Sequence, residues 1–148
     1  MIIRLANIND CRLYFDWFND STVRQNAFTE NKVDWQAHKQ WFKDKLDSHN
    51  SYLYIAQEGD IDIGQVRFDC ANKKATVDYS IDSRYRNLGF GKMMLEMVLD
   101  NFARAKTDIE VIVAQVKEEN VASSIIFTKL NFTKSSEEDR VITYTLSL

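Results

Sequence analysis

The sequence contains no proline, and only four of its 148 residues are glycine. Its turns must therefore rely largely on Asn, Asp and Ser, which also favour turn conformations. It has only two cysteines, Cys11 and Cys70, which are far apart and lack the spacing of a metal site. We therefore expect two reduced thiols, a cytoplasmic location and no bound metal.

Long apolar runs and a strong charge imbalance are also missing. No stretch of about 18 apolar residues is present, and no apolar run follows an N-terminal basic segment. The sequence therefore predicts neither a transmembrane helix nor a signal peptide, and we expect no membrane partner. The net charge of −3 argues against the broad basic surface that binds nucleic acid.

What is present suits one folded domain. The hydrophobic fraction is 45% and the aromatic fraction is 12%, which is enough apolar material for a core without disulfides. A length of 148 residues is typical of one domain, and the chain shows no linker, internal repeat or low-complexity segment. We predict a single domain over residues 1–148.

Hydrophobic periodicity predicts the order β-α-α-β-β-β-α-β-α-β-β. Strands are expected at residues 2–5, 52–57, 61–68, 75–81, 109–116, 132–134 and 141–146. Helices are expected from a cap at Asn9 or Asp10, briefly through Arg24, from a cap at Asp34 to Leu46, over residues 92–105, and from a cap at Asn120 to about residue 130. The β-loop-α-β unit over residues 75–116 calls for one parallel pair with a right-handed crossover. We predict an α/β protein with a mixed, mostly antiparallel sheet and helices on both faces.

The most informative segment joins the predicted strand 75–81 to the helix 92–105. It reads Arg86-Asn87-Leu88-Gly89-Phe90-Gly91-Lys92, an R-x-x-G-x-G pattern. A helix start presents unpaired N–H groups and the positive end of the helix dipole, and glycine lets the backbone approach an anion. A pyrophosphate satisfies such donors, and Arg86 and Lys92 add positive charge. The spacing is neither that of the dinucleotide fingerprint nor that of a P-loop, and glycines also cap helices for structural reasons.

This segment resembles the acetyl-CoA signature of the GNAT superfamily of N-acetyltransferases, Q/R-x-x-G-x-G/A after the fourth strand. A second segment, Asn120 to Phe132, is similar to the family's N-x-x-[SA]-x-x-x-Y-x-K-x-G-F helix. The resemblance covers essentially the whole chain. It implies the GNAT fold, with seven strands and a V-shaped splay between strands four and five, and acetyl-CoA as co-substrate.

The resemblance also implies direct attack of an amine on the thioester, without an acetyl-enzyme. The pantetheine arm is expected to pair with the fourth strand near Ser80 and Ile81, where the backbone N–H of Ile81 stabilises the oxyanion. Asn120 has two possible roles, a cofactor contact and a helix cap. The expected cofactor contacts are Ser80, Ile81, Arg86, Asn87, Leu88, Gly89, Phe90, Gly91, Lys92, Asn120 and Phe127.

The attacking amine must lose a proton, so a base or a chain of water molecules is needed. Asp78 is the first candidate, because it shares a strand face with Ser80 along the predicted cleft. Glu110 is a weaker candidate, and its alternative is a surface position. For His38, packing or substrate orientation is expected before a role as base.

The leaving thiolate lacks the usual partner. The tyrosine that serves as acid in many family members aligns with Phe127, which has no proton to donate. Water or another tyrosine, such as Tyr79, is left for this role. Because a thiol pKa is about 8.5, an acid is also optional.

The N-terminal part resembles one branch of the family. Trp17-Phe18-Asn19-Asp20, Val23-Arg24 and His38 with Trp41 are similar to a pattern in acetyltransferases that act on nucleotide-linked amino sugars, such as those of pseudaminic-acid biosynthesis. The branch implies a UDP-sugar or a similar small-molecule amine as acceptor. The implied substrate-binding residues are Trp17, Arg24, His38 and Trp41, although aromatic residues at helical spacing are also typical of a core.

Three alternatives remain open from the sequence. A basic, aromatic-rimmed pocket suits a diphosphate sugar, for which Arg24, Arg67 and Arg84 are available, whereas an acidic groove suits a peptide or ribosomal-protein N-terminus. A module that binds acetyl-CoA without catalysis is the third. Either a monomer or a homodimer is compatible with the sequence.

Overall fold

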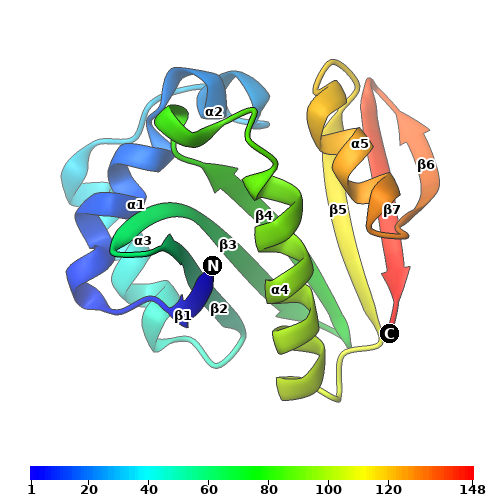
Figure 1. The fold of residues 1–148 in the computed structure, drawn as a ribbon, viewed down its shortest axis with the longest axis horizontal. Coiled ribbons are helices and arrows are strands. Elements are labelled where there is room, and N and C mark those ends of the chain that lie inside the picture. The colour runs from blue at the N-terminus through cyan, green and yellow to red at the C-terminus, as the bar shows by residue number, and fades with distance from the viewer.

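A seven-stranded mixed sheet forms the centre of the protein, seen in a computed structural model that describes residues 1–148 (Figure 1). The strand order is β1-β2-β3-β4-β5-β7-β6. The pair β4–β5 is parallel and every other pair is antiparallel, as predicted. The strands are β1 (Ile2–Leu5), β2 (Ser51–Glu58), β3 (Ile61–Ala71), β4 (Lys74–Ile81), β5 (Val111–Lys117), β6 (Thr133–Glu138) and β7 (Val141–Ser147).

Helices cover both faces of this sheet. The helices are η1 (Ile8–Asp10), α1 (Cys11–Phe18), α2 (Ser21–Asn26), α3 (Trp35–Asp47), η2 (Ser83–Tyr85), α4 (Phe90–Ala105) and α5 (Val121–Lys129). The larger core lies under α4 and α5 and contains Met94, Phe102 and Phe127. A smaller core joins α1 and α3 to the opposite face through Phe42 and Leu53. No helix is both long and apolar enough to cross a membrane, and no cluster of His, Cys, Asp and Glu side chains is arranged to hold a metal ion.

The N-terminal cap differs from the prediction. Asn7, rather than Asn9 or Asp10, caps the first helical turn, since its side chain accepts from the Asn9 N–H at 2.9 Å. The Asp10 carboxylate accepts in return from the Asn7 N–H at 2.8 Å and from Arg4. Asp10 does occupy the N-cap position of α1, as predicted, but its side chain makes no cap hydrogen bond there and instead holds the preceding turn against β1.

Two strands run three or more residues past their predicted ends. The strands β3 and β6 extend to Ala71 and Glu138 because two-residue turns, Asn72-Lys73 and Asp139-Arg140, follow them. All four turn residues have positive φ, between 51° and 65°. This is the backbone of tight hairpin turns, which usually contain glycine. With so few glycines available, both hairpins use non-glycine residues.

The parallel pair is joined at one end only. The strands β4 and β5 pair from Lys74↔Val111 to Thr76↔Val113 and no further. Beyond that point β4 stays paired with β3 as far as Ile81, while β5 stays paired with β7. The two strands diverge toward the top of the view (Figure 1), which is the predicted V-shaped splay.

Gly64 allows β3, β4 and α4 to meet closely. A Cβ at this position would lie 2.7 Å from the Ser80 carbonyl oxygen, 2.8 Å from Ile81 Cδ1 and 2.9 Å from Met94 Sδ. The first contact is with backbone, which cannot move aside without breaking the sheet.

We expect Gly64→Ala to lower the free energy of unfolding by about 1–3 kcal/mol, the usual cost of overpacking a core. Urea denaturation measures this loss. Gly59→Ala is the control, because its Cβ meets nothing within 4 Å and only its φ of +60° opposes the change. Equal losses in the two variants would contradict the steric explanation.

Candidate functional site

The loop between β4 and α4 presents a row of unpaired backbone donors. The N–H groups of residues 86–92 donate to no protein acceptor, and the first N–H of the helix with a partner is that of Met93, which donates to Gly89 O at 3.4 Å. Asn87 and Gly89 have φ of +63° and +81°, in the left-handed region. These two residues turn the chain so that the row leads directly into α4. Such a row of N–H groups at a helix start favours the binding of an anion.

The side chain of Arg86 fixes the start of this loop. Its Nε donates to the carbonyl oxygen of Ile81 at 3.0 Å, and its Nη2 lies 2.8 Å from Asp20 Oδ2. Burial raises the pKa of Asp20, but the hydrogen bond and charge of Arg86 and the backbone hydrogen bonds from Val23 and Thr22 together outweigh burial, so the pKa is lowered. Lys92 also has an acidic neighbour, Glu96, at 3.6 Å. Both basic residues expected at the loop are therefore already paired with carboxylates.

The edge of β4 that faces the splay can be assigned from one hydrogen bond. The Asp82 N–H donates to Ile63 O at 2.8 Å, so it points toward β3. Backbone groups alternate in direction along a strand, so those of Ser80 also point toward β3, whereas those of Tyr79 and Ile81 point into the splay. Ile81 thus presents its N–H there, and Ser80 contributes only a side chain.

Asp78 lies on the sheet face that α1 and α3 cover, next to the splay. Its Oδ2 accepts from Gln65 Nε2 at 3.2 Å and lies 3.9 Å from Arg67 Nη1, yet the side chain stays 55% exposed. Gln65 is buried and also donates to Ser80 Oγ at 3.1 Å, while its own Oε1 has no partner. The carboxylate is thus both held in place and accessible.

Glu110 lies elsewhere. It precedes β5 at the closed end of the splay, where its N–H donates to Lys73 O. Its carboxylate is 71% exposed and lies 3.5 Å from Lys73 Nζ. The structure therefore places Asp78 beside the opening and Glu110 away from it, because the pairing of β4 with β5 ends between them.

Two aromatic rings lie between two arginines beside Asp78. The Arg24 guanidinium lies 3.6 Å from the centroid of the Phe18 ring, which lies 6.2 Å from that of Trp41, and Arg67 lies 5.1 Å from the Trp41 ring. Arg24 is buried and donates only to the carbonyl oxygens of Phe18 and Thr29. Burial lowers the pKa of Arg24, and the charge of Asp78 partly offsets this effect. Two of the three arginines considered from the sequence thus meet here.

Arg84, the third arginine, and Trp17 belong to another cluster. Both donate to Asp82, Arg84 Nε at 3.0 Å to Oδ1 and Trp17 Nε1 at 3.0 Å to Oδ2. The hydrogen bond from Arg84 is the main reason why the pKa of Asp82 lies well below its ordinary value. Trp17 is buried in the smaller core. This cluster ties α1 to the start of the loop rather than lining an opening.

His38 is a packed histidine. It is 2% exposed, and its Nε2 lies 3.1 Å from Cys11 O. Rings surround it at centroid distances of 5.2–6.3 Å, from Phe15, Phe18, Trp35, Trp41 and Phe42. Burial lowers the pKa of His38. Its ring packs against that of Trp41, and its burial leaves it no access to the splay.

The helix α5 borders the splay on the other face. The Asn120 side chain accepts from the Ser123 N–H at 3.3 Å, so the cap predicted for Asn120 is present. Phe127 is buried, and its ring packs edge-on against that of Tyr79 at 5.7 Å. The Tyr79 and Ser123 hydroxyl oxygens lie 2.7 Å apart.

Sequence reasoning missed Lys117. Its Nζ donates to the carbonyl oxygen of Gln25 at 2.8 Å, which links the end of β5 to the end of α2 across the open end of the splay. Along β5, Ala114 and Val116 point into the larger core, so Lys117 projects to the same side as Asp78. Its position at the last residue of a strand beside the cleft was the available signal.

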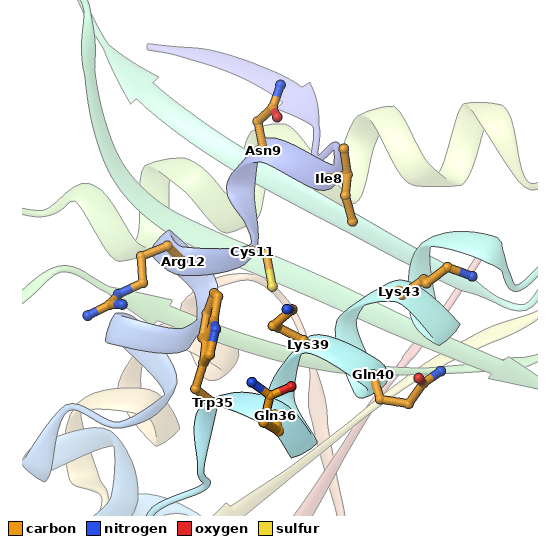
Figure 2. A pocket seen from close by; sticks show the side chains of 9 residues that line it. All are labelled: Ile8, Asn9, Cys11, Arg12, Trp35, Gln36, Lys39, Gln40 and Lys43. Atoms are coloured by element: carbon orange, nitrogen blue, oxygen red, sulfur yellow. The ribbon is translucent and has the colours of Figure 1, made fainter.

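One surface hollow is separate from these residues. It measures about 550 Å³ and lies between the start of α1 and α3 (Figure 2). It is lined by Ile8, Asn9, Cys11, Arg12, Trp35, Gln36, Lys39, Gln40 and Lys43. None of these was predicted as a site residue, and the hollow opens on the outer side of the two helices. Its size alone does not make it the active site.

Comparison with solved structures shows the same fold. A spermidine N-acetyltransferase from Vibrio cholerae, solved with CoA and spermine, is 14% identical, with a TM-score of 0.88 over 99% of this chain and 94% of that one. A ribosomal-protein-alanine N-acetyltransferase from Brucella melitensis is 17% identical, with a TM-score of 0.83 over 100% of both chains. A putative acetyltransferase from Salmonella typhimurium, solved with acetyl-CoA, is 18% identical, with a TM-score of 0.83 over 100% of this chain and 94% of that one.

Sequence comparison defines the family. No curated protein matches the chain by sequence. The model of the acetyltransferase (GNAT) domain family matches residues 1–133, which include the β4–α4 loop, the splay and the Asn120 cap. The chain therefore belongs to the GNAT family of N-acetyltransferases.

Proposed function

We propose that the protein transfers an acetyl group from acetyl-CoA directly to a primary amine. The observation that carries this proposal is the opening between β4 and β5, which leads to the unpaired N–H groups of residues 86–92. A thioester arm needs an extended slot, and a diphosphate needs a row of donors. The fold neighbours solved with CoA or acetyl-CoA support the choice of cofactor.

Each part of the cofactor has a partner in this arrangement. The pyrophosphate binds the N–H groups of the loop, at the positive end of the α4 dipole. The pantetheine amides pair with the open edge of β4 at Tyr79 and Ile81, and Asn120 closes the other side. The Ile81 N–H then donates to the thioester oxygen as it becomes an oxyanion. Phe127 forms the apolar floor of the slot.

Asp78 is the proposed base. It is the carboxylate beside the opening, and Gln65 and Arg67 hold it from the side. An amine that enters on the face of α1 and α3 meets Asp78 before it reaches the free edge of β4. The carboxylate takes the amine proton directly or through water. Attack, oxyanion formation and collapse then need no covalent enzyme intermediate.

The acceptor we propose is the amine of a nucleotide-linked amino sugar, such as a UDP-sugar. Arg67 lies 3.9 Å from Asp78, the charge of Asp78 acts on Arg24, and Trp41 offers an aromatic surface beside Arg67. Lys117 lies at the end of β5, across the splay, where it contacts Gln25 and Glu30. Diphosphates pair well with arginine forks, and sugars and bases stack on aromatic rings. A polyamine would meet repulsion from the same cations, so spermidine suits this site poorly.

A panel of amines tests the proposal. Acetyl-CoA binding is followed by calorimetry, and turnover is followed by release of free thiol. We expect turnover with UDP-linked amino sugars and little with spermidine or with peptides that carry a free N-terminus. Faster turnover of peptides than of amino sugars would mean that the acceptor is a peptide N-terminus and not a nucleotide-linked amino sugar. Binding of acetyl-CoA without turnover of any amine would favour a binding module instead.

Arg67→Met should raise the KM for the phosphorylated acceptor about tenfold or more, because it removes one charge-assisted hydrogen-bond donor. The KM for acetyl-CoA should not change, and initial rates with each substrate varied in turn measure both. Arg67 also pairs with Asp69 at 2.9 Å, so the loss of this ion pair must be separated from the loss of acceptor binding. Lys45→Met is the matched control, since Lys45 pairs with the same Asp69 at 2.7 Å. An equal rise in both variants would count against acceptor binding by Arg67.

A further inference from the structure

The contact between Tyr79 and Ser123 joins β4 to α5 beside the splay. The two hydroxyl oxygens lie 2.7 Å apart, a normal distance for an O–H···O hydrogen bond. Tyr79 comes from the strand whose free edge faces the opening, and Ser123 comes from the first turn of the helix that borders it. The contact therefore lies beside the opening between β4 and β5, where α5 meets β4.

The number of hydrogens in this pair leaves one donor unused. Each hydroxyl carries one hydrogen, and only one of them can lie between the two oxygens. Neither hydroxyl has any other acceptor in the protein. Whichever oxygen donates within the pair, the other O–H remains available to a third group. The pair is thus a hydrogen-bond donor that the protein itself does not satisfy.

Packing fixes the direction of Tyr79. Its ring meets that of Phe127 edge-on, at 84° and a centroid distance of 5.7 Å. On its other side, the ring lies close to Gly91, where an added Cβ would be 3.7 Å from Tyr79 Cε2. With α4 on one side and α5 on the other, the phenol has little freedom to turn away. A donor held in this way is preorganised, which is what makes it useful in a reaction.

We propose that the Tyr79–Ser123 hydroxyl pair donates a hydrogen bond to the sulfur of the thioester as the sulfur departs. This inference rests on the proposed function, because it requires the thioester to lie along the free edge of β4. Phe127 has no polar atom with which to serve the sulfur, whereas the hydroxyl pair, whose tyrosine packs against the Phe127 ring, has an O–H to spare.

The step balances without proton transfer from tyrosine. The amine nitrogen forms a bond to the acetyl carbon, the carbon–sulfur bond breaks, and its electron pair stays on sulfur as thiolate. The proton lost by the amine goes to Asp78 and then to solvent. Burial raises the pKa of Tyr79, whereas a thiol has a pKa of about 8.5, so the phenol keeps its proton and only shares it. The thiolate leaves and takes a proton from water.

Single-turnover kinetics with acetyl-CoA and the best amine from the panel test this role. We expect Tyr79→Phe to slow acetyl transfer about tenfold to a hundredfold, the value of one hydrogen bond to a charged group. The dissociation constant for acetyl-CoA should stay within about twofold, because the bond strengthens only as charge develops on sulfur. The shape of the pH–rate profile should not change, since the phenol does not titrate during the reaction.

Variants of the serine separate a joint role from two independent ones. Ser123→Ala should slow transfer less than Tyr79→Phe, and the double variant should be no slower than Tyr79→Phe, since the two groups act as one donor. Ser123→Thr, which keeps the hydroxyl, should restore the rate. Ser124→Ala is the control, because Ser124 is the next residue of α5 and its Oγ has no partner.

The outcomes distinguish this inference from the proposed function. A wild-type protein that fails to bind acetyl-CoA overturns both. Normal wild-type turnover with an unchanged rate in Tyr79→Phe overturns only the role of the pair. A loss of acetyl-CoA affinity as large as the loss of rate would make the pair a binding contact and would also overturn it. Thermal melting of each variant identifies any loss that comes from unfolding.

Discussion

Gly89→Glu is expected to weaken acetyl-CoA binding by at least about a hundredfold, which corresponds to about 2.8 kcal/mol. Gly89 is the N-cap of α4, at the centre of the unpaired N–H groups, and a Cβ there would meet nothing within 4 Å. A glutamate side chain would therefore extend into open space in front of the loop. Its carboxylate would occupy the same donors as the diphosphate and repel it.

Two other substitutions of Gly89 separate the effect of charge from that of backbone strain. Gly89→Ala tests the φ of +81°, which disfavours any side chain and costs about 1–2 kcal/mol of stability. Gly89→Gln has nearly the shape of glutamate without its charge. Calorimetric titration should show a modest loss for Ala, an intermediate loss for Gln and the largest for Glu. Unchanged affinity in Gly89→Glu would mean that the diphosphate binds elsewhere.

Asp78→Asn is expected to lower kcat about a hundredfold or more while the affinity for acetyl-CoA is retained, since general-base catalysis typically contributes this much. Asparagine keeps the size of the side chain and can still contact Gln65 and Arg67. It cannot accept the amine proton. Steady-state rates of the variant and the wild type over the same range of pH measure this loss.

Glu110→Gln is the matched control for this change. It neutralises another accessible carboxylate, at the closed end of the same pair of strands, 3.5 Å from Lys73. We expect wild-type turnover from it. If Glu110→Gln were the slower variant, or if Asp78→Asn had the same pH–rate profile as the wild type, the assignment of the base to Asp78 would be wrong.

Features that depend on short stretches of backbone could be predicted from the sequence. The order of strands follows from periodicity, and the crossover from β4 to β5 follows from the one long helix between them. The left-handed φ at Gly89 is consistent with glycine at the start of a helix. The Asn120 cap was likewise predictable, because a cap depends on residues within one turn.

Features that depend on which elements meet could not be predicted. Arg86 was expected to contribute its charge to the loop, but Asp20, from another part of the chain, pairs with it. Lys117 meets Gln25 because the end of α2 lies beside the end of β5, and Arg24 and Arg67 are linked through the rings of Phe18 and Trp41. Periodicity specifies which face a residue occupies but not which distant residue lies opposite. Nor does it show where the pairing of two strands ends, which is what separates Asp78 from Glu110.

The single short parallel junction also affects how the chain folds. The strands β2, β3 and β4 follow one another as hairpins within residues 51–81, and β6 and β7 form another hairpin near the C-terminus. Hairpins need only short loops to close and form early. Joining β4 to β5 requires α4 to be in place first and gains only three residue pairs. We therefore expect the seam between β4 and β5, which later receives the cofactor, to form after the hairpins on either side of it when the full chain refolds.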